Sequence, residues 1–169
     1  DFCLSRGLGD VYKRQEFLVR GALEYNEPGV LVSFEETSDE LITNATSIGC
    51  NLADLVSGKK LILDEVLLEP NEIEETGAYD LEGLFIRLGY AIDSIGAKRV
   101  VLDTIEALFS IFSDEFTLRS ELHRLFRWLK GKGVTAVITA ERGQGALTRH
   151  GLEELSLIHI SEPTRQAEI

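Results

Sequence analysis

Hydrophobic residues recur along the chain in two alternating patterns, as short continuous runs and as positions three or four residues apart. Continuous runs between turn residues are typical of buried strands, and the wider spacing is typical of amphipathic helices. The two patterns predict strands at residues 30–34, 60–66, 98–103 and 134–140, and helices at residues 16–26, 38–49, 51–58, 80–95 and 114–132. Because helices alternate with strands, we expect an α/β fold with a mostly parallel sheet and helices on both faces.

Polar residues and glycines mark the ends of these predicted helices. Thr37 or Ser38 is expected to cap the helix that follows, because a hydroxyl oxygen can accept a hydrogen bond from the first helical turn. Gly96 and Gly133 follow long helical patterns and are expected to end them. The segments that carry neither pattern are predicted to be connections, at residues 68–80, 104–113 and 141–154.

The first and last fifteen residues are related through the genetic code, although their amino-acid sequences differ. Every residue of 1–15 has a codon whose reverse complement encodes its counterpart in 155–169; CAG for Gln15, for example, becomes CTG for Leu155. We interpret both ends as an inverted DNA repeat that resembles translated adapter ends of sequencing libraries. The predicted organisation is therefore a non-native segment at 1–15, a partial domain at 16–154 and a non-native segment at 155–169. The native fold is predicted from residues 16–154 alone.

Charge and composition narrow the classes of partner. The chain has 17 Lys and Arg residues against 29 Asp and Glu residues, a net charge of −12, so it should repel a phosphate backbone and we expect no nucleic-acid partner. No apolar stretch reaches the length of about 18 residues that a membrane span requires, so no membrane association is expected and the cytoplasm is the expected compartment. Cys50 is the one cysteine of residues 16–154, which excludes a disulfide framework and a cysteine zinc site there.

Asp103 is the first candidate for chemistry, because it ends the predicted strand 98–103. Ligands of parallel α/β sheets bind at the carboxyl ends of the strands, and a carboxylate there can hold Mg²⁺, through water in nucleotide-hydrolysing folds. The alternative is an aspartate that only caps the turn after a strand. The sequence therefore offers a candidate metal site at this edge of the sheet.

Glu35 and Glu36 directly follow the predicted strand 30–34 and are the second candidate. Adjacent carboxylates raise each other's cost of ionisation, which favours a functional role, and one of them could deprotonate a water aimed at a γ-phosphate. The alternative is a surface charge pair at the start of a helix. Thr139 and Glu141 end the fourth predicted strand and are expected at the same edge.

The phosphate-cradling motif GxxxxGK[ST] does not occur in the sequence. Its backbone N–H groups and its lysine would supply the contacts that hold a nucleoside triphosphate. The chain by itself is therefore expected not to bind ATP tightly.

Three stretches resemble the KaiC family of RecA-like ATPases: residues 27–55 (with FEET), residues 77–109 (with VVLDT) and residues 135–154. The likeness covers essentially all of residues 16–154 and is nearer to the N-terminal of the two KaiC ATPase lobes. The resemblance implies a RecA-like P-loop NTPase fold, truncated at both ends, that uses ATP and Mg²⁺. It also implies roles for individual residues: Glu35 as catalytic base with Glu36 beside it, Asp103 as Walker B metal carboxylate, and Ser47, Thr104 and Glu141 as nucleotide-contacting positions.

The same resemblance implies an assembly and partners. Proteins of the KaiC family form homo-hexameric rings with ATP at the subunit interfaces, work with KaiA and KaiB in the circadian clock, and carry Ser/Thr autokinase activity in the second lobe. Since the P-loop is missing, this chain alone is expected to be inactive. Two other hypotheses about function stay open. The first is a RecA-superfamily DNA recombinase or helicase, which the net charge of −12 disfavours, and the second is a non-catalytic interaction fragment.

Overall fold

A computed structural model describes residues 9–47, 49–66, 81–110 and 115–140 of the chain. The elements in chain order are α1 (Gly9–Glu24), β1 (Gly29–Ser33), α2 (Ser38–Ser47), α3 (Leu52–Ser57), β2 (Leu61–Glu65), α5 (Glu82–Ile95), β3 (Arg99–Asp103), η1 (Ile105–Ser110), α6 (Glu115–Lys132) and β4 (Thr135–Ile138). All the strands and helices predicted from hydrophobic spacing are present. In the described part, no helix is long and apolar enough to cross a membrane.

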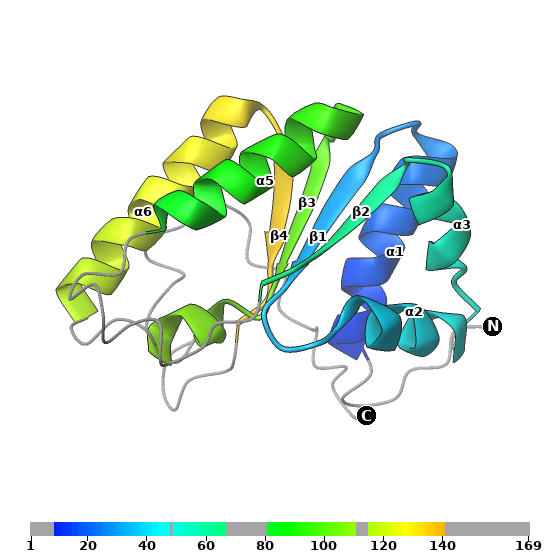
Figure 1. The fold of residues 1–169 in the computed structure, drawn as a ribbon, viewed down its shortest axis with the longest axis horizontal. Helices are drawn as coiled ribbons and strands as arrows, with labels where there is room; N and C mark the ends of the chain where they lie inside the picture. The colour runs from blue at the N-terminus through cyan, green and yellow to red at the C-terminus, as the bar shows by residue number, and fades with distance from the viewer. Residues whose placement is uncertain (1–8, 48, 67–80, 111–114, 141–169) are drawn as a thin grey trace, which may run out of the picture.

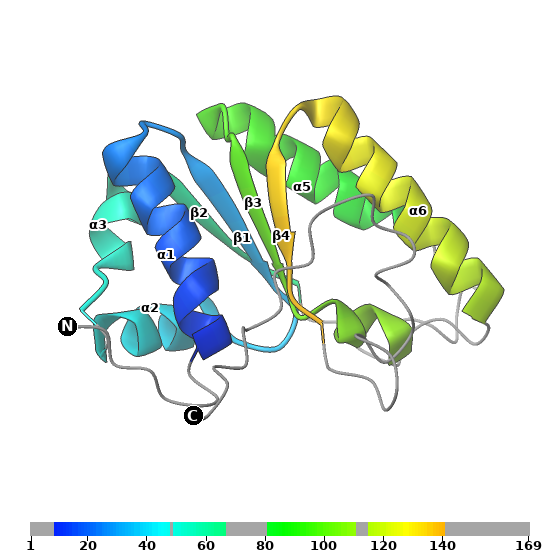
Figure 2. The same cartoon turned by 180° about the vertical axis from the view of Figure 1, so that it is seen from behind.

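The four strands form one parallel sheet with the order β2-β1-β3-β4. Helices α5 and α6 cover one face of the sheet, and α1, α2 and α3 cover the other (Figures 1 and 2). The predicted α/β fold with a parallel sheet and helices on both faces is thus confirmed. In Figure 1 the carboxyl ends of the strands lie at the bottom of the sheet, together with the start of α1 and the whole of α2.

Strand β1 shows why the sequence runs are continuous rather than alternating. Val30 and Val32 point into the core beneath α5 and α6, whereas Leu31 points into the core beneath α1, α2 and α3. Strand β3 repeats the arrangement with Val100 and Leu102 on one side and Val101 on the other. A strand buried on both faces needs apolar residues at every position, which is why parallel sheets appear as unbroken hydrophobic runs.

Helix α1 begins at Gly9, well before the predicted start at residue 16. Nothing in residues 10–15 interrupts a helix, and the side chains of Arg14 and Gln15 are buried, with 7% and 1% exposure. The end also differs: the helix stops at Glu24 because Asn26 adopts a left-handed φ of 53°, which an asparagine tolerates but a helix cannot continue through. The predicted boundary at residue 15 therefore lies inside one continuous helix.

The stretch predicted as a hydrophobic connection after Asp103 contains the short 3₁₀ helix η1. Ile105 and Leu108 are both almost fully buried, with 0% and 1% exposure. Residues three apart share one side of a 3₁₀ helix, which has three residues per turn, so this spacing anchors η1 to the core. A single pair of apolar residues three positions apart is too short a pattern to predict a helix, so the sequence did not indicate η1.

The caps follow the predicted residues. Thr37 caps α2: its Oγ1 accepts from the Glu40 N–H at 3.3 Å, while Glu40 Oε2 accepts from the Thr37 N–H at 2.9 Å and from its hydroxyl at 2.8 Å. This reciprocal arrangement is a capping box. The backbone and then the hydroxyl hydrogen bonds from Thr37 lower the pKa of Glu40. Gly96 and Gly133 end α5 and α6 with φ of 63° and 69°.

Candidate functional site

The carboxyl ends of β1 and β3 bring the two predicted carboxylate segments together. In the parallel register Ser33 lies opposite Asp103, and the next N–H group, that of Phe34, donates to the carbonyl oxygen of Asp103 at 3.0 Å. The chain leaves the sheet immediately afterwards, so Glu35 and Glu36 begin the loop beside Asp103. The pairing of two strands that are far apart in sequence thus builds an acidic edge.

Asp103 is buried, with 3% exposure, and each of its carboxylate oxygens contacts a donor. The Thr139 hydroxyl donates to Oδ1 at 2.5 Å, and the Thr139 backbone N–H donates to the Leu102 carbonyl at 3.0 Å. Nη1 of Arg14 forms an ion pair with Oδ2. A carboxylate this far from water is stable in its ionised form only when a cation and hydrogen bonds compensate for lost hydration.

Glu36 faces the same guanidinium group. Nη2 of Arg14 lies 2.7 Å from Oε2 of Glu36, and Nδ2 of Asn44 donates to Oε1 at 3.0 Å. The backbone N–H of Glu36 donates to Oγ of Ser33 at 2.9 Å, which turns the chain sharply after β1. Arg14 therefore bridges the carboxylates of Glu36 and Asp103, and Asn44 fixes the Glu36 side chain from α2.

Glu35 lies differently, because its side chain is exposed while that of its neighbour is half-buried. The structure thus brings Glu36, rather than Glu35, into the cluster around Asp103. Which of the two serves as a base remains a prediction from the family resemblance. Their different surroundings mean that the adjacent carboxylates are not equivalent.

Two of the three predicted nucleotide-contacting residues, Thr104 and Ser47, lie in the described part of the chain. Thr104 directly follows Asp103 at the sheet edge, and its carbonyl accepts from the Ala107 N–H at 3.3 Å as η1 begins. Ser47 ends α2, at the opposite end of that helix from Glu36, and its hydroxyl donates to the Asn44 carbonyl at 2.6 Å. Glu141 lies outside the described residues. Their proposed contacts with nucleotide stay predictions.

Sequence reasoning missed three members of this edge. Arg14 was missed because residues 1–15 were set aside, and Asn44 because an asparagine within a helix gives no signal of its own. Glu65 ends β2 at the same edge, and its Oε2 accepts from the Ser38 N–H at 3.1 Å, at the start of α2. The rule that selected Asp103, a carboxylate at the carboxyl end of a predicted strand, missed Glu65 by one residue, because the predicted strand 60–66 ends at Val66.

In this chain, donor groups contact both carboxylate oxygens of Asp103, the residue at which Mg²⁺ was predicted to bind through water, so the predicted Mg²⁺ of the whole protein stays a prediction. Mg²⁺ takes oxygen ligands, yet Arg14 and Thr139 engage the two oxygens of Asp103, and Arg14 engages Glu36 as well. Within the described residues, no group of three or more His, Cys, Asp or Glu side chains could hold a metal ion. Among the described residues, the guanidinium group of Arg14 supplies positive charge to these carboxylates.

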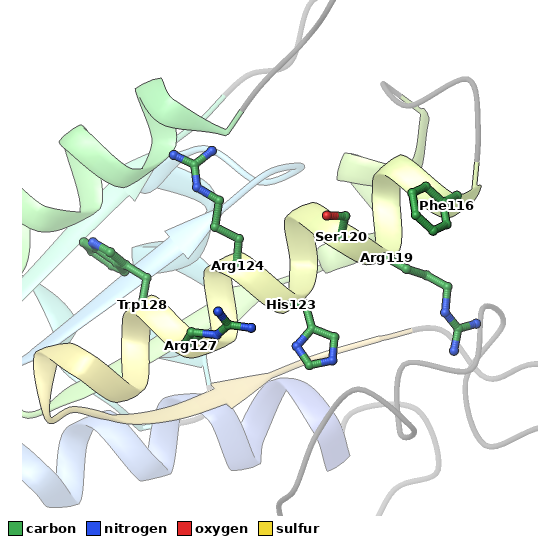
Figure 3. Close-up of a pocket in the computed structure, with 7 residues that line it drawn as sticks. All are labelled: Phe116, Arg119, Ser120, His123, Arg124, Arg127 and Trp128. Atoms are coloured by element: carbon green, nitrogen blue, oxygen red, sulfur yellow. The ribbon is translucent and has the colours of Figure 1, made fainter.

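A separate hollow lies on the outer side of α6 (Figure 3). It is lined by Phe116, Arg119, Ser120, His123, Arg124, Arg127 and Trp128. Arg124 forms an ion pair with Glu82 and stacks over the Phe85 ring at 4.7 Å, so it ties α6 to α5. None of the lining residues is a predicted site residue, and the hollow is distinct from the acidic edge.

Comparison with known proteins gives a consistent result. A family model described as "ATPase: KaiC" matches residues 7–162. The circadian clock protein KaiC2 of Synechocystis sp. (strain ATCC 27184 / PCC 6803 / Kazusa) is 62% identical over 152 residues, which is 90% of this chain and 27% of that protein. The circadian clock oscillator protein KaiC of Synechococcus elongatus (strain ATCC 33912 / PCC 7942 / FACHB-805) is 39% identical over 89% of this chain and 29% of its own length. The chain thus spans less than a third of these relatives.

Proposed function

Since the chain belongs to the KaiC family of ATPases, we propose that the whole protein hydrolyses ATP at the edge where Asp103 and Glu36 meet. The observation that carries this proposal is the register of β1 and β3, which pairs Ser33 with Asp103 and so sets the glutamate pair beside the buried aspartate. An acidic edge at the carboxyl ends of parallel strands is where α/β sheets bind their ligands. The α/β fold with a parallel sheet agrees with a RecA-like domain.

In this proposal Glu35 is the general base. A base must reach both the attacking water and the substrate, and the exposed side chain of Glu35 meets that need. The side chain of Glu36 is held by Asn44 and its backbone N–H by Ser33, so its part is to fix the turn that presents Glu35. The base would take a proton from the water as its oxygen attacks the γ-phosphorus and the bond to ADP breaks.

Nucleotide contacts from Ser47, Thr104 and Glu141 belong to the same proposal. We also propose that the whole protein assembles into a homo-hexamer with ATP at the subunit interfaces and has a second lobe with Ser/Thr autokinase activity. Its proposed partners are proteins of the KaiA and KaiB type, its proposed role is in the circadian clock or related signalling, and its proposed location is the cytoplasm. What supports the clock role is that KaiC2 of Synechocystis and KaiC of Synechococcus elongatus, to which the chain is similar, are circadian clock proteins. For the 169-residue chain alone we propose no ATPase activity, because the sequence lacks GxxxxGK[ST].

The test is ATP hydrolysis by the full-length protein. Glu35→Gln keeps the size of the side chain but removes its basicity, and the rate is expected to fall by about 100-fold or more. Glu24→Gln, at a half-exposed position of α1, is the control and should leave the rate unchanged. A wild-type rate in Glu35→Gln would refute the assignment of the base, and stimulation of the rate by DNA would favour a recombinase or helicase.

A further inference from the structure

The loop that carries Glu35 is tied to the sheet on both sides. Near its start, Oγ of Ser33 accepts from the backbone N–H of Glu36 at 2.9 Å. At its end, Oε2 of Glu65 accepts from the backbone N–H of Ser38 at 3.1 Å, across 27 positions of the sequence. The side chain of Glu35 is exposed, so packing around it does not fix its place. The position of this carboxylate therefore depends on how the backbone of the loop is anchored.

Glu65 is itself held in place at the end of β2. The parallel register sets it opposite Ser33, and the N–H of the next residue, Val66, donates to the Ser33 carbonyl at 2.9 Å. Nη2 of Arg87, in α5, donates to the backbone carbonyl of Glu65 at 2.9 Å and to Oδ1 of Asp64 at 2.5 Å. A side chain can position another group accurately when its own backbone is fixed by neighbouring contacts. Glu65 meets this condition.

The hydrogen bond to Glu65 does something that the local cap of α2 cannot do. The capping box of Thr37 and Glu40 joins residues of one helix end, so it fixes the shape of that end but not its place on the sheet. The Ser38 N–H is one of the first-turn donors that a helix leaves without an intrahelical partner. Its acceptor comes from β2, and the helix dipole favours a carboxylate at this end. The bond thus ties the start of α2 directly to the end of β2.

We infer that Glu65 is a positioning residue for Glu35, and that it acts through the backbone of Ser38 without touching substrate. The inference deepens the proposed function and rests on it for one point, the role of Glu35 as the base. A displacement of about 1 Å is enough to cost a catalytic group much of its effect. Without an acceptor at Glu65 the first turn of α2 can move relative to β2, and the Glu35 carboxylate is no longer held where the attacking water needs it.

The test compares ATP hydrolysis by the full-length protein with that of Glu65→Met and Glu65→Gln. Methionine keeps the length of the side chain but lacks the acceptor, whereas glutamine keeps both. We expect kcat of Glu65→Met to fall about ten-fold while KM for ATP changes less than about two-fold, and Glu65→Gln to retain most of the rate. Asp93→Ala, which removes an exposed carboxylate of α5, is the control and should leave kcat unchanged. An unchanged kcat in Glu65→Met, or an equal loss in Glu65→Gln, overturns the inference.

A double variant tests whether Glu65 acts through the base. Glu35→Gln combined with Glu65→Met should be no slower than Glu35→Gln alone, because a base that is absent cannot be misplaced. If the two losses multiply instead, Glu65 acts by another route and the inference is wrong. Glu65→Ala replaces Glu65→Met in both comparisons if circular dichroism shows that the methionine variant does not fold.

Amide hydrogen exchange of the same full-length proteins separates this inference from the ATPase proposal. Mass spectrometry of a peptide that covers residues 34–40 should show faster exchange in Glu65→Met than in the unaltered protein, and little change in Glu65→Gln. Unchanged exchange in Glu65→Met overturns the inference whatever the rates of hydrolysis are. If Glu35→Gln hydrolyses ATP at the wild-type rate, the assignment of the base fails, and the exchange still decides whether Glu65 holds this loop.

Discussion

The hydroxyl of Thr139 donates a hydrogen bond to Oδ1 of Asp103 and so joins the ends of β4 and β3. The acceptor is a carboxylate with 3% exposure, for which water cannot replace a lost donor. A hydrogen bond to a buried charged group contributes more to stability than one between neutral groups at the surface. The contact therefore couples the integrity of the sheet edge to the state of its central carboxylate.

Replacing Thr139 by valine should consequently destabilise the fold. Valine keeps the shape of threonine but lacks the donor, so the free energy of unfolding should fall by about 1.5–3 kcal/mol. Urea unfolding monitored by circular dichroism measures the change. Thr139→Ser retains the hydroxyl and is the matched control; if Thr139→Val is as stable as Thr139→Ser, the hydrogen bond does not contribute.

The capping box of α2 should make stability depend on pH. The hydrogen bonds from the Thr37 backbone and hydroxyl lower the pKa of Glu40 from its ordinary value of 4.5. A carboxyl with a lowered folded-state pKa stabilises the protein above its ordinary pKa, and that contribution is lost as pH falls through the folded-state value. The difference in Tm between the unaltered chain and Glu40→Gln should thus shrink as pH drops below 4.5. A difference in Tm that stays constant across this pH range would contradict a stabilising role for these hydrogen bonds.

Gln15 offers a stabilising substitution. Its amide is buried without hydrogen-bond partners in the described part, so Gln15→Leu removes an unsatisfied group and adds apolar contacts. We expect the free energy of unfolding to rise by about 1–2 kcal/mol. Arg20→Leu, at a position with 57% side-chain exposure, should change it by less than about 0.5 kcal/mol. Calorimetric Tm values check both, and a lower Tm for Gln15→Leu than for the unaltered chain would contradict the burial of the amide.

Two glycines in helices should respond oppositely to alanine. A Cβ on Gly21 would come within 2.4 Å of the Arg99 side chain, which lies over the rings of Phe17 and Tyr25 and pairs with Glu27 at 2.7 Å. Gly21→Ala should displace Arg99 and lower the free energy of unfolding by about 1–3 kcal/mol. Gly131→Ala meets no atom within 4 Å and should raise it by up to about 1 kcal/mol. Urea unfolding measures the free energy of unfolding of both variants. If Gly21→Ala stabilises the protein as Gly131→Ala does, the Arg99 side chain moves aside without cost and the prediction is wrong.

Much of the fold was predictable because its signals are local. Each strand is a continuous apolar run and each helix carries an apolar stripe. The run from Val30 to Val32 therefore predicts β1, and the spacing from Leu118 to Leu129 predicts α6. The shared edge of Asp103 and the glutamate pair was also predictable, because the carboxyl ends of parallel strands lie on one side of a sheet. The sequence also limited the cap of α2 to Thr37 or Ser38, because a cap bonds to the first turn of its own helix.

The sequence by itself thus determined the α/β class, the elements and the edge at which the acidic residues meet. Only the tertiary structure decided the strand order, the inward turn of Glu36 while Glu35 stays exposed, and the bridge from Arg14 to Glu36 and Asp103. The physical reason is distance along the chain. Hydrophobic spacing and capping act between neighbours, whereas an ion pair such as that between Arg14 and Glu36 joins residues 22 positions apart and exists only once the sheet and its helices have packed.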